Sequence, residues 1–164
     1  MWDNHQAPRA WTPGALRELS VAFQSSRLLL TAIELRLFTL LGTEALKSDE
    51  IAARAGTDPQ ATDRLLNALG ALHLLLKRNG QFRNTPEGLR YLVDSSLEYA
   101  AGLGHSASMW HSWTTLTEKV RDGGRHARPA VNDRGDAWLE PFIAAMHYRG
   151  RLQADTIASL LPLT

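Results

Sequence analysis

LLLTAIELRLFTLL at residues 28–41 begins the stretch of sequence that decides the fold. It is followed by SDEIAARAG (48–56), DPQATDRLLNALGALHLL (58–75) and LLKRNGQFRNT (75–85). The first three segments carry apolar residues at helical spacing. The fourth holds Asn79-Gly80 between two short segments, a strong signal for a two-residue hairpin because both central residues need a positive φ. The order therefore predicts three helices followed by a two-stranded hairpin.

Turn and capping residues place the ends of these helices. Gly42 ends the first, and Gly56 ends the second because glycine tolerates the left-handed conformation. Ser48 is expected to cap the second helix, and Asp58-Pro59 to open the third. The third helix is expected to bury one apolar stripe, formed by Ala61, Leu65, Ala68, Leu69 and Leu72. Three helices and a hairpin in this order predict a winged helix, a fold used for reading DNA or for packing and dimerisation.

The N-terminal helix is expected to run from about Pro13 to Leu41, in one piece or with a break. It is apolar around most of its circumference over residues 28–41, where only Glu34 and Arg36 are charged. A helix that is apolar on nearly every side needs burial on nearly every side. Because a winged helix covers only one face of it, the sequence predicts a second copy of the chain in an intertwined dimer.

The final seventy residues carry only helical patterns. One helix is expected to place four apolar residues on one face and to end at Asp122-Gly123-Gly124; these residues are Met109, Trp113, Leu116 and Val120. A polar loop follows, and a last helix begins near Asp136 and extends past Gly150. Gly102 and Gly104 are expected to break whatever helix precedes Met109.

The predicted fold class is mainly α, with a winged-helix core, a small β-hairpin and additional long helices. We expect an N-terminal arm over residues 1–14, a winged-helix dimerisation domain over 15–95 and a helical extension over 96–164. The 164 residues suffice for a real hydrophobic core. The N-terminus has no signal-peptide pattern, and no apolar run reaches the ~20 residues of a membrane span. We therefore expect a cytoplasmic protein that contacts no membrane.

Residues suited to catalysis or to metal binding are scarce. The chain has no cysteine, which excludes disulfides and thiolate chemistry. Its six histidines show no spacing typical of metal ligands, so we expect them to be exposed or hydrogen-bonded. Alternating strands and helices are missing, which excludes a nucleotide-binding parallel sheet. The sequence predicts no catalytic residue, no cofactor site and no metal site.

DNA binding is an unfavourable prediction for this chain. Its net charge is +1, whereas nucleic-acid binders gather basic residues on one face. Outside its apolar stripe the third helix offers Asp58 and Asp63 against the single Arg64, a poor match for phosphate groups. The hairpin carries Lys77, Arg78 and Arg83, but basic residues are also common on solvated hairpins. A MarR-like transcriptional regulator that binds DNA and a small ligand therefore stays as the alternative.

Five segments in a fixed order resemble a known family. They are ELRLFTLL, SDEIAARAG, DPQATDRLLNALGALHLLLKRNGQFRNTPEG, MWHSWTTLTEKVRDG and FIAAMHYR. This order resembles the N-terminal dimerisation region of S-adenosylmethionine-dependent O-methyltransferases, both the plant caffeate-type enzymes and the bacterial enzymes of polyketide tailoring. The resemblance covers about residues 15–160. It implies a homodimer in which this region also covers the pocket of a small aromatic acceptor.

In that family the cofactor and the catalytic base belong to a C-terminal Rossmann-like domain. No residue of this chain matches those positions, so we expect either a piece of a larger methyltransferase or a stand-alone relative, inactive on its own. S-adenosylmethionine is expected only for the full-length parent. The resemblance implies that four residues face the acceptor substrate and hold it by shape and apolar contact: Phe142, Met146, Met109 and Trp113.

Overall fold

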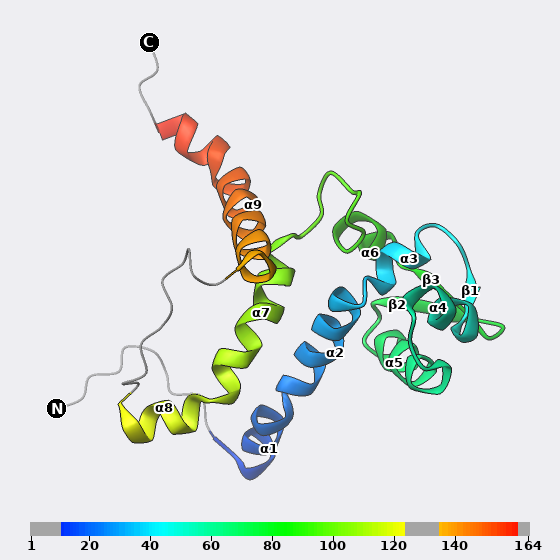
Figure 1. Cartoon of the computed structure of the whole chain (residues 1–164), viewed down its shortest axis with the longest axis horizontal. Helices are drawn as coiled ribbons and strands as arrows, with labels where there is room; N and C mark the ends of the chain where they lie inside the picture. Colours follow the sequence, from blue (N-terminus) through cyan, green and yellow to red (C-terminus); the bar gives the residue numbers. More distant parts are fainter. Residues whose placement is uncertain (1–10, 124–134, 161–164) are drawn as a thin grey trace.

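The computed structural model describes residues 11–123 and 135–160. The helices are α1 (Pro13–Val21), α2 (Phe23–Glu34), α3 (Leu37–Leu41), α4 (Ser48–Ala55), α5 (Pro59–Ala71), α6 (Pro86–Tyr91), α7 (Gly102–Thr114), α8 (Leu116–Asp122) and α9 (Asp136–Leu160). The strands are β1 (Leu46–Lys47), β2 (Leu75–Arg78) and β3 (Gln81–Asn84). The protein is thus mainly helical with a small sheet, as the sequence predicts. Figure 1 shows α3 to α6 gathered with the strands at one end and α7 to α9 at the other, with α2 between them.

The sheet is antiparallel and has the strand order β1-β3-β2. The hairpin predicted at Asn79-Gly80 is confirmed, because both residues have a positive φ, of 51° and 76°. The sequence predicts two strands, and the structure adds β1, which pairs Leu46 with Phe82 of the central strand. Phe82 is fully buried and packs into a core with apolar residues from α2 to α5, among them Phe38, Leu41, Ile51, Leu66 and Leu69.

The helix predicted from Pro13 to Leu41 is divided into α1, α2 and α3. The main break lies at Arg36, whose φ of 53° is left-handed and ends the regular helix. Because of this break, Leu37 and Leu41 belong to a different helix from Leu30, and both helices face the same core. Leu37 and Leu41 are buried within the single protomer. The protomer therefore covers this part of the stretch by itself, whereas Leu28 and Leu35 stay partly exposed, so the expected second subunit stays a prediction.

The predicted helix ends are confirmed with one exception. Asp58 accepts a hydrogen bond from the Ala61 backbone N–H at 2.7 Å, and Gly56 is left-handed with a φ of 65°. Ser48, predicted as a cap, is instead the first residue of α4. The capping residue is Lys47, whose backbone N–H donates to a Glu50 carboxylate oxygen at 2.8 Å. The strand β1 runs directly into the helix, so the cap lies one residue earlier.

The buried face of α5 lies one residue away from the predicted stripe at most positions. The structure buries Thr62, Leu66 and Leu69, whereas Ala61 is exposed and Leu65 is only half-buried. Thr62 is tolerated inside because its hydroxyl hydrogen-bonds the Thr57 hydroxyl at 2.7 Å. Because of this rotation, Ala61 and Leu65 lie outside the core, on the side of α5 that faces α2.

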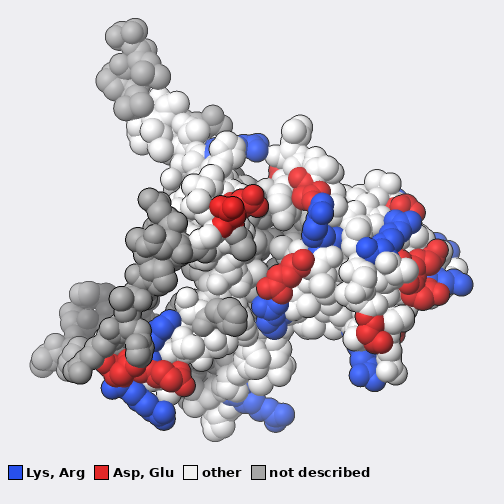
Figure 2. All heavy atoms as spheres, viewed as in Figure 1, with Lys and Arg blue, Asp and Glu red and all other residues white. Residues whose placement is uncertain are grey.

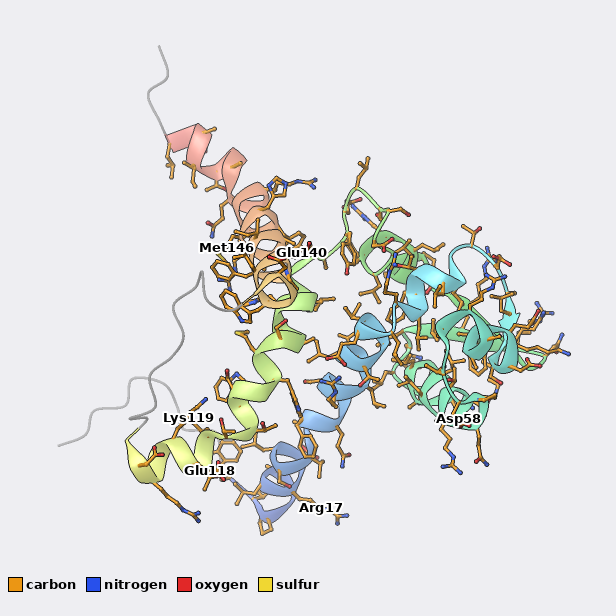
Figure 3. The ribbon with its side chains drawn as sticks, in the orientation of Figure 1. Arg17, Asp58, Glu118, Lys119, Glu140 and Met146 are labelled. Atoms are coloured by element: carbon orange, nitrogen blue, oxygen red, sulfur yellow. The ribbon has the colours of Figure 1, made fainter. Side chains whose placement is uncertain are left out.

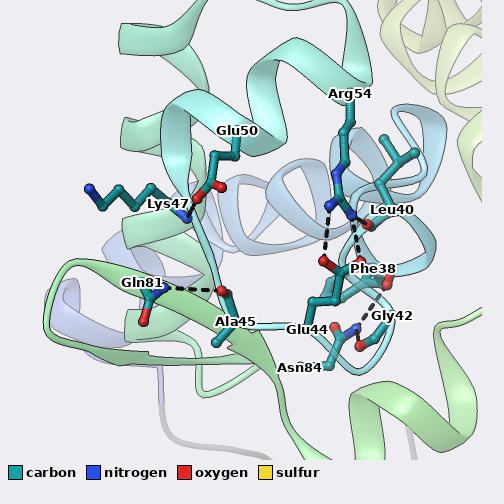
Figure 4. Close-up of polar contacts among 10 residues, drawn as sticks. All are labelled: Phe38, Leu40, Gly42, Glu44, Ala45, Lys47, Glu50, Arg54, Gln81 and Asn84. Atoms are coloured by element: carbon teal, nitrogen blue, oxygen red, sulfur yellow. Dashed lines mark hydrogen bonds and ion pairs between the residues drawn. The ribbon is translucent and has the colours of Figure 1, made fainter.

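Two polar side chains hold the loop after α3 in place (Figure 4). The buried Asn84 amide donates to the carbonyls of Phe38 at 2.8 Å and Gly42 at 2.9 Å. Arg54 donates to both carboxylate oxygens of Glu44, at 2.8 and 2.9 Å, and these hydrogen bonds lower the pKa of Glu44. Because the Arg54–Glu44 pair is exposed, it contributes little to stability. The hydrogen bonds of the buried Asn84 amide therefore stabilise the loop after α3 more than this ion pair does.

The late helix predicted through Met109 and Val120 is two helices, with the break at Thr115. Gly123 ends α8 with a φ of 74°, which confirms that end, while Gly124 and the polar loop after it lie outside the described residues. Helix α9 begins at Asp136 and continues past Gly150, as predicted. Over the described ranges, no helix combines the length and the apolar character needed to span a membrane.

Candidate functional site

Helices α7 and α9 pack together around three aromatic rings, which we term the aromatic cluster: His105, Trp138 and Phe142. The rings of Trp138 and Phe142 stack with centroids 4.8 Å apart and planes inclined by 16°. His105 of α7 meets both rings edge-on, at 5.6 Å from Trp138 and 5.3 Å from Phe142. Aromatic pairs at these separations add to the apolar energy of packing. The cluster therefore fixes α9 against the first half of α7.

Two glycines of α7 lie where this helix packs against α9. A Cβ on Gly104 would lie 3.6 Å from the Cβ of Pro141, and one on Gly102 would lie 3.9 Å from the Cβ of Ala145. The prediction that these glycines break a helix is wrong, because Gly102 begins α7 and Gly104 lies inside it. Packing against α9 stabilises the helix there and overrides the low helical propensity of glycine.

Replacing Gly104 with alanine is expected to stabilise the protein by about 0.5–1 kcal/mol, the usual gain for this change inside a helix. A Cβ at 3.6 Å from Pro141 is an ordinary contact, and Gly104 has no left-handed φ that would oppose it. Gly123→Ala is the matched contrast, since its φ of 74° should make the same change destabilising. Urea unfolding monitored by circular dichroism measures both. A loss of stability in Gly104→Ala would mean that α7 and α9 have no room for a methyl group.

The structure places the four residues expected to face a substrate on α7 and α9. Phe142 is half-buried in the aromatic cluster, and Met146 lies one turn further along α9, on the exposed surface. Figure 3 shows Met146 and Glu140 on opposite sides of α9. Met109 and Trp113 lie one turn apart on α7 and are exposed, Trp113 by 66%. None of the four lines either of the two cavities described below.

Trp138 and His105 are the cluster members that the sequence does not single out, and His105 also departs from what is expected of the histidines. Its Nδ1 atom is buried and has no hydrogen-bond partner among the described residues, contrary to the expectation that the histidines are exposed or hydrogen-bonded. A usable signal was present, because His105 lies one helical turn before Met109 and so shares its face. A buried nitrogen inside an apolar cluster is a polar atom available to a ligand or a water molecule.

An apolar groove of about 620 Å³ lies between α2 and α5, and we term it the α2–α5 groove. Its lining includes Leu28 and Leu35 of α2 and Ala61 and Leu65 of α5, with Phe23 at one end. The cation at its edge is Arg27, which is paired with Glu34 and lies over the Trp110 ring at 5.5 Å from the centroid. The groove is therefore an apolar surface with its nearby charge already compensated.

A second cavity, of about 640 Å³, lies between the α2–α3 break and the helices α7 and α9. Arg36 and Asp94 form an ion pair at its edge, and Glu140 and Tyr99 also line it. Burial raises the pKa of the Tyr99 hydroxyl, an effect that Asp94 adds to and Arg36 opposes. Groups of both charges line this cavity, so it favours neither anions nor strongly apolar molecules.

Apolar side chains are left exposed on α1 and at the start of α2. Leu16 is 52% exposed, Leu19 57% and Phe23 52%, and Trp11 and Val21 beside them are exposed to a similar degree. A second exposed apolar row continues along α7 and α8, formed by Met109, Trp113, Leu116 and Val120. Contiguous apolar surface of this kind marks an interaction site. It adds to the partly exposed Leu28 and Leu35 of residues 28–41 as apolar surface that the described residues leave open to a partner.

The described residues give little support to other classes of site. Within residues 11–123 and 135–160, no three His, Asp or Glu side chains come together as metal ligands would. The sheet in these ranges is wholly antiparallel, unlike a nucleotide-binding sheet. Figure 2 shows acidic and basic residues interspersed over α3 to α6 on the face in view, with no continuous basic surface there. The DNA-binding alternative therefore gains no support.

Comparison with known proteins gives one consistent result. The sequence-family model of the O-methyltransferase dimerisation domain matches residues 17–94. The tetracenomycin polyketide synthesis 8-O-methyl transferase of Streptomyces glaucescens is 39% identical over 146 residues, which cover 87% of this chain and 42% of that protein. The chain thus spans less than half the length of this relative.

Solved structures agree in fold. An O-methyltransferase family protein from Burkholderia thailandensis superposes with a TM-score of 0.76 at 29% identity, covering 94% of this chain and 47% of its own. Human N-acetylserotonin methyltransferase, in complex with SAM, gives a TM-score of 0.76 at 22% identity and covers 96% and 51%. At that identity the second comparison speaks for the fold alone.

Proposed function

Residues 17–94 belong to the family of O-methyltransferase dimerisation domains, and from this premise we propose that the chain joins two copies of an S-adenosylmethionine-dependent O-methyltransferase and helps to cover its acceptor substrate. The observation that carries the proposal is the exposed apolar surface of α1 and of the start of α2, of which Leu19, Val21 and Phe23 lie within the family segment. A lone protomer would leave that surface in water, and a second copy removes it from water.

The pairing is tested by sedimentation equilibrium on the chain. A dimer of twice the 18.2 kDa protomer mass is expected at micromolar concentration, and a monomer at 100 µM would contradict the proposal. We also propose that α3 to α5 with the β2–β3 hairpin form a winged helix used for packing. The copies then intertwine through the N-terminal helices and through α7 to α9, with residues 15–95 as the dimerisation unit and residues 96–164 as the extension.

The second part of the proposal concerns the acceptor. The stacked rings of Trp138 and Phe142, with Met146, Met109 and Trp113 on the same pair of helices, offer flat and adaptable apolar surface to an aromatic molecule. The Streptomyces glaucescens relative is named for a step of polyketide synthesis, which favours a flat polyketide-like acceptor. The role of these side chains is to orient the acceptor, since none of them transfers a proton.

The methionines give a direct test of this acceptor site. The chain has three of them, Met1, Met109 and Met146, so methyl-labelled methionine yields three NMR signals. Titration with 1-naphthol is expected to shift the Met109 and Met146 signals saturably, and the Phe142→Ala variant should weaken binding at least about fivefold because it removes the stacked ring. Ile143→Ala, an exposed neighbour, is the control. Unchanged Met109 and Met146 signals at millimolar naphthol would overturn the assignment.

We propose S-adenosylmethionine as the methyl donor of the full-length parent and assign it no residue in this chain. When bound, that cofactor supplies an electrophilic methyl group to the acceptor. The described sheet, within residues 46–84, is antiparallel and differs from the parallel sheet that binds nucleotides. In this proposal the chain's own contribution is to bind and orient the acceptor and to exclude water.

A further inference from the structure

We propose that helix α1 of a second copy of this chain lies in the α2–α5 groove. The inference rests on the proposed dimerisation and goes beyond it, because it assigns the surface that each copy offers and the helix that fills it. Two features have to match: an apolar ridge on one copy and an apolar groove on the other.

The ridge is formed by three side chains, Leu16, Leu19 and Phe23. They are spaced by three and four residues, and the backbone of Ala22 between α1 and α2 keeps the right-handed helical conformation, with φ −58° and ψ −27°. Side chains at this spacing lie on one face of a helix. Each is more than half exposed, and no residue of α1 is buried within the protomer. Helix α1 therefore has an apolar face that residues 11–123 and 135–160 of its own chain leave exposed.

The groove offers a matching apolar surface with few polar groups left to satisfy. The hydroxyls of Thr57 and Thr62 hydrogen-bond each other, and the Arg27 Nε donates to the Thr31 hydroxyl at 3.0 Å. The guanidinium of Arg27 is also paired with Glu34. Gln24 also lines the groove but lies at an exposed position, so an apolar helix can cover Leu28 and Leu65 while the threonine and arginine groups beside them keep their partners. A polar small molecule would find few free partners there.

Position and symmetry favour a second copy as the occupant. All residues that line the groove, from Phe23 to Leu65, lie inside the matched dimerisation segment of residues 17–94. Phe23 belongs both to the ridge and to the groove lining, so the two features are adjacent on one surface. A two-fold axis beside Phe23 places each ridge in the opposite groove, which is the self-complementary arrangement that a symmetric dimer needs.

Cysteine cross-linking tests the arrangement cleanly because the chain has no cysteine of its own. Leu19→Cys carrying one tag and Ala61→Cys carrying another are co-expressed and oxidised with copper phenanthroline, and Leu16→Cys replaces Leu19→Cys in a parallel sample. Ala61 lies on the groove lining and is exposed in the protomer. The control partner is Ala53→Cys, on an exposed position of α4 that does not line the groove.

The expected result is a disulfide-linked product carrying both tags in at least one Ala61→Cys sample, at least tenfold above the Ala53→Cys control. Sedimentation of the same reduced samples separates the two ideas. The samples could be dimeric and still give no mixed disulfide with Ala61→Cys at either ridge position. That result would overturn the groove assignment but would still support dimerisation. Monomers would overturn the proposed function as well. Equal cross-linking to Ala53→Cys would mean random collision and would also count against the groove.

Discussion

Replacing both Leu16 and Leu19 with glutamate is expected to convert the dimer into a monomer, with a dissociation constant raised at least about a thousandfold. Burying a leucine side chain completely contributes about 1.5–3 kcal/mol. The two side chains are roughly half exposed in the protomer, so four of them in a dimer contribute about 4 kcal/mol together, which corresponds to about a thousandfold. Glutamate also adds four carboxylates whose desolvation opposes pairing. Sedimentation equilibrium measures the change.

The variant leaves the protomer intact, because α1 contributes no buried residue to the core. Circular dichroism and urea unfolding check this directly. The control is Leu97→Glu, which adds the same charge at a leucine that is 87% exposed in the segment between α6 and α7. The dimer of this control variant should have the same dissociation constant as the dimer of the unaltered chain. A double variant that still dimerises with unchanged affinity would remove α1 from the interface, whatever the cross-linking pattern.

The part of the fold that sequence predicts well is the part governed by local chemistry. Asn79-Gly80 specifies a hairpin because few other pairs accept two positive φ values, and Asp58-Pro59 specifies a helix start because one caps and the other fits the first turn. These effects act within a few residues. They are the same in a peptide and in the folded protein, so they can be read without coordinates.

The predictions that are wrong depend on packing between distant segments. Arg36 adopts a left-handed conformation without being glycine, and its ion pair with Asp94, 58 residues away, helps to hold it there. No residue close to Arg36 in the sequence predicts that break, so the pattern of residues 28–41 indicates a single apolar helix. Gly104 is the opposite case, since its propensity predicts a break and contact with Pro141 of α9 makes it part of a helix. The four proposed substrate residues stay a prediction, because their role depends on a bound acceptor.

The second large effect is expected at Asn84. Its amide donates to two backbone carbonyls, so the site needs a donor and has no use for a negative charge. Asn84→Asp keeps the shape, removes both N–H donors and sets a buried carboxylate against two carbonyl oxygens. An uncompensated buried charge of this kind is expected to cost about 3–5 kcal/mol at pH 7. Urea unfolding measures the free energy of unfolding.

The pH dependence separates this charge effect from a simple loss of packing. Burial and the facing carbonyls favour the protonated acid, so the folded-state pKa of the new carboxyl should rise above its unfolded value of about 3.9. Between those two pKa values the folded protein binds more protons than the unfolded chain, and the free energy of unfolding therefore falls as pH rises. The free energy of unfolding of Asn84→Asp should thus approach that of Asn84→Ala as the pH falls from 7 toward 4.

Asn84→Ala is the control because it adds no charge. Its free energy of unfolding should be about 1–3 kcal/mol lower than that of the unaltered chain at every pH. If the free energies of unfolding of the two variants keep a constant difference over this range, the carboxyl at position 84 is not buried against the two carbonyls, which would contradict the role given to the Asn84 donors.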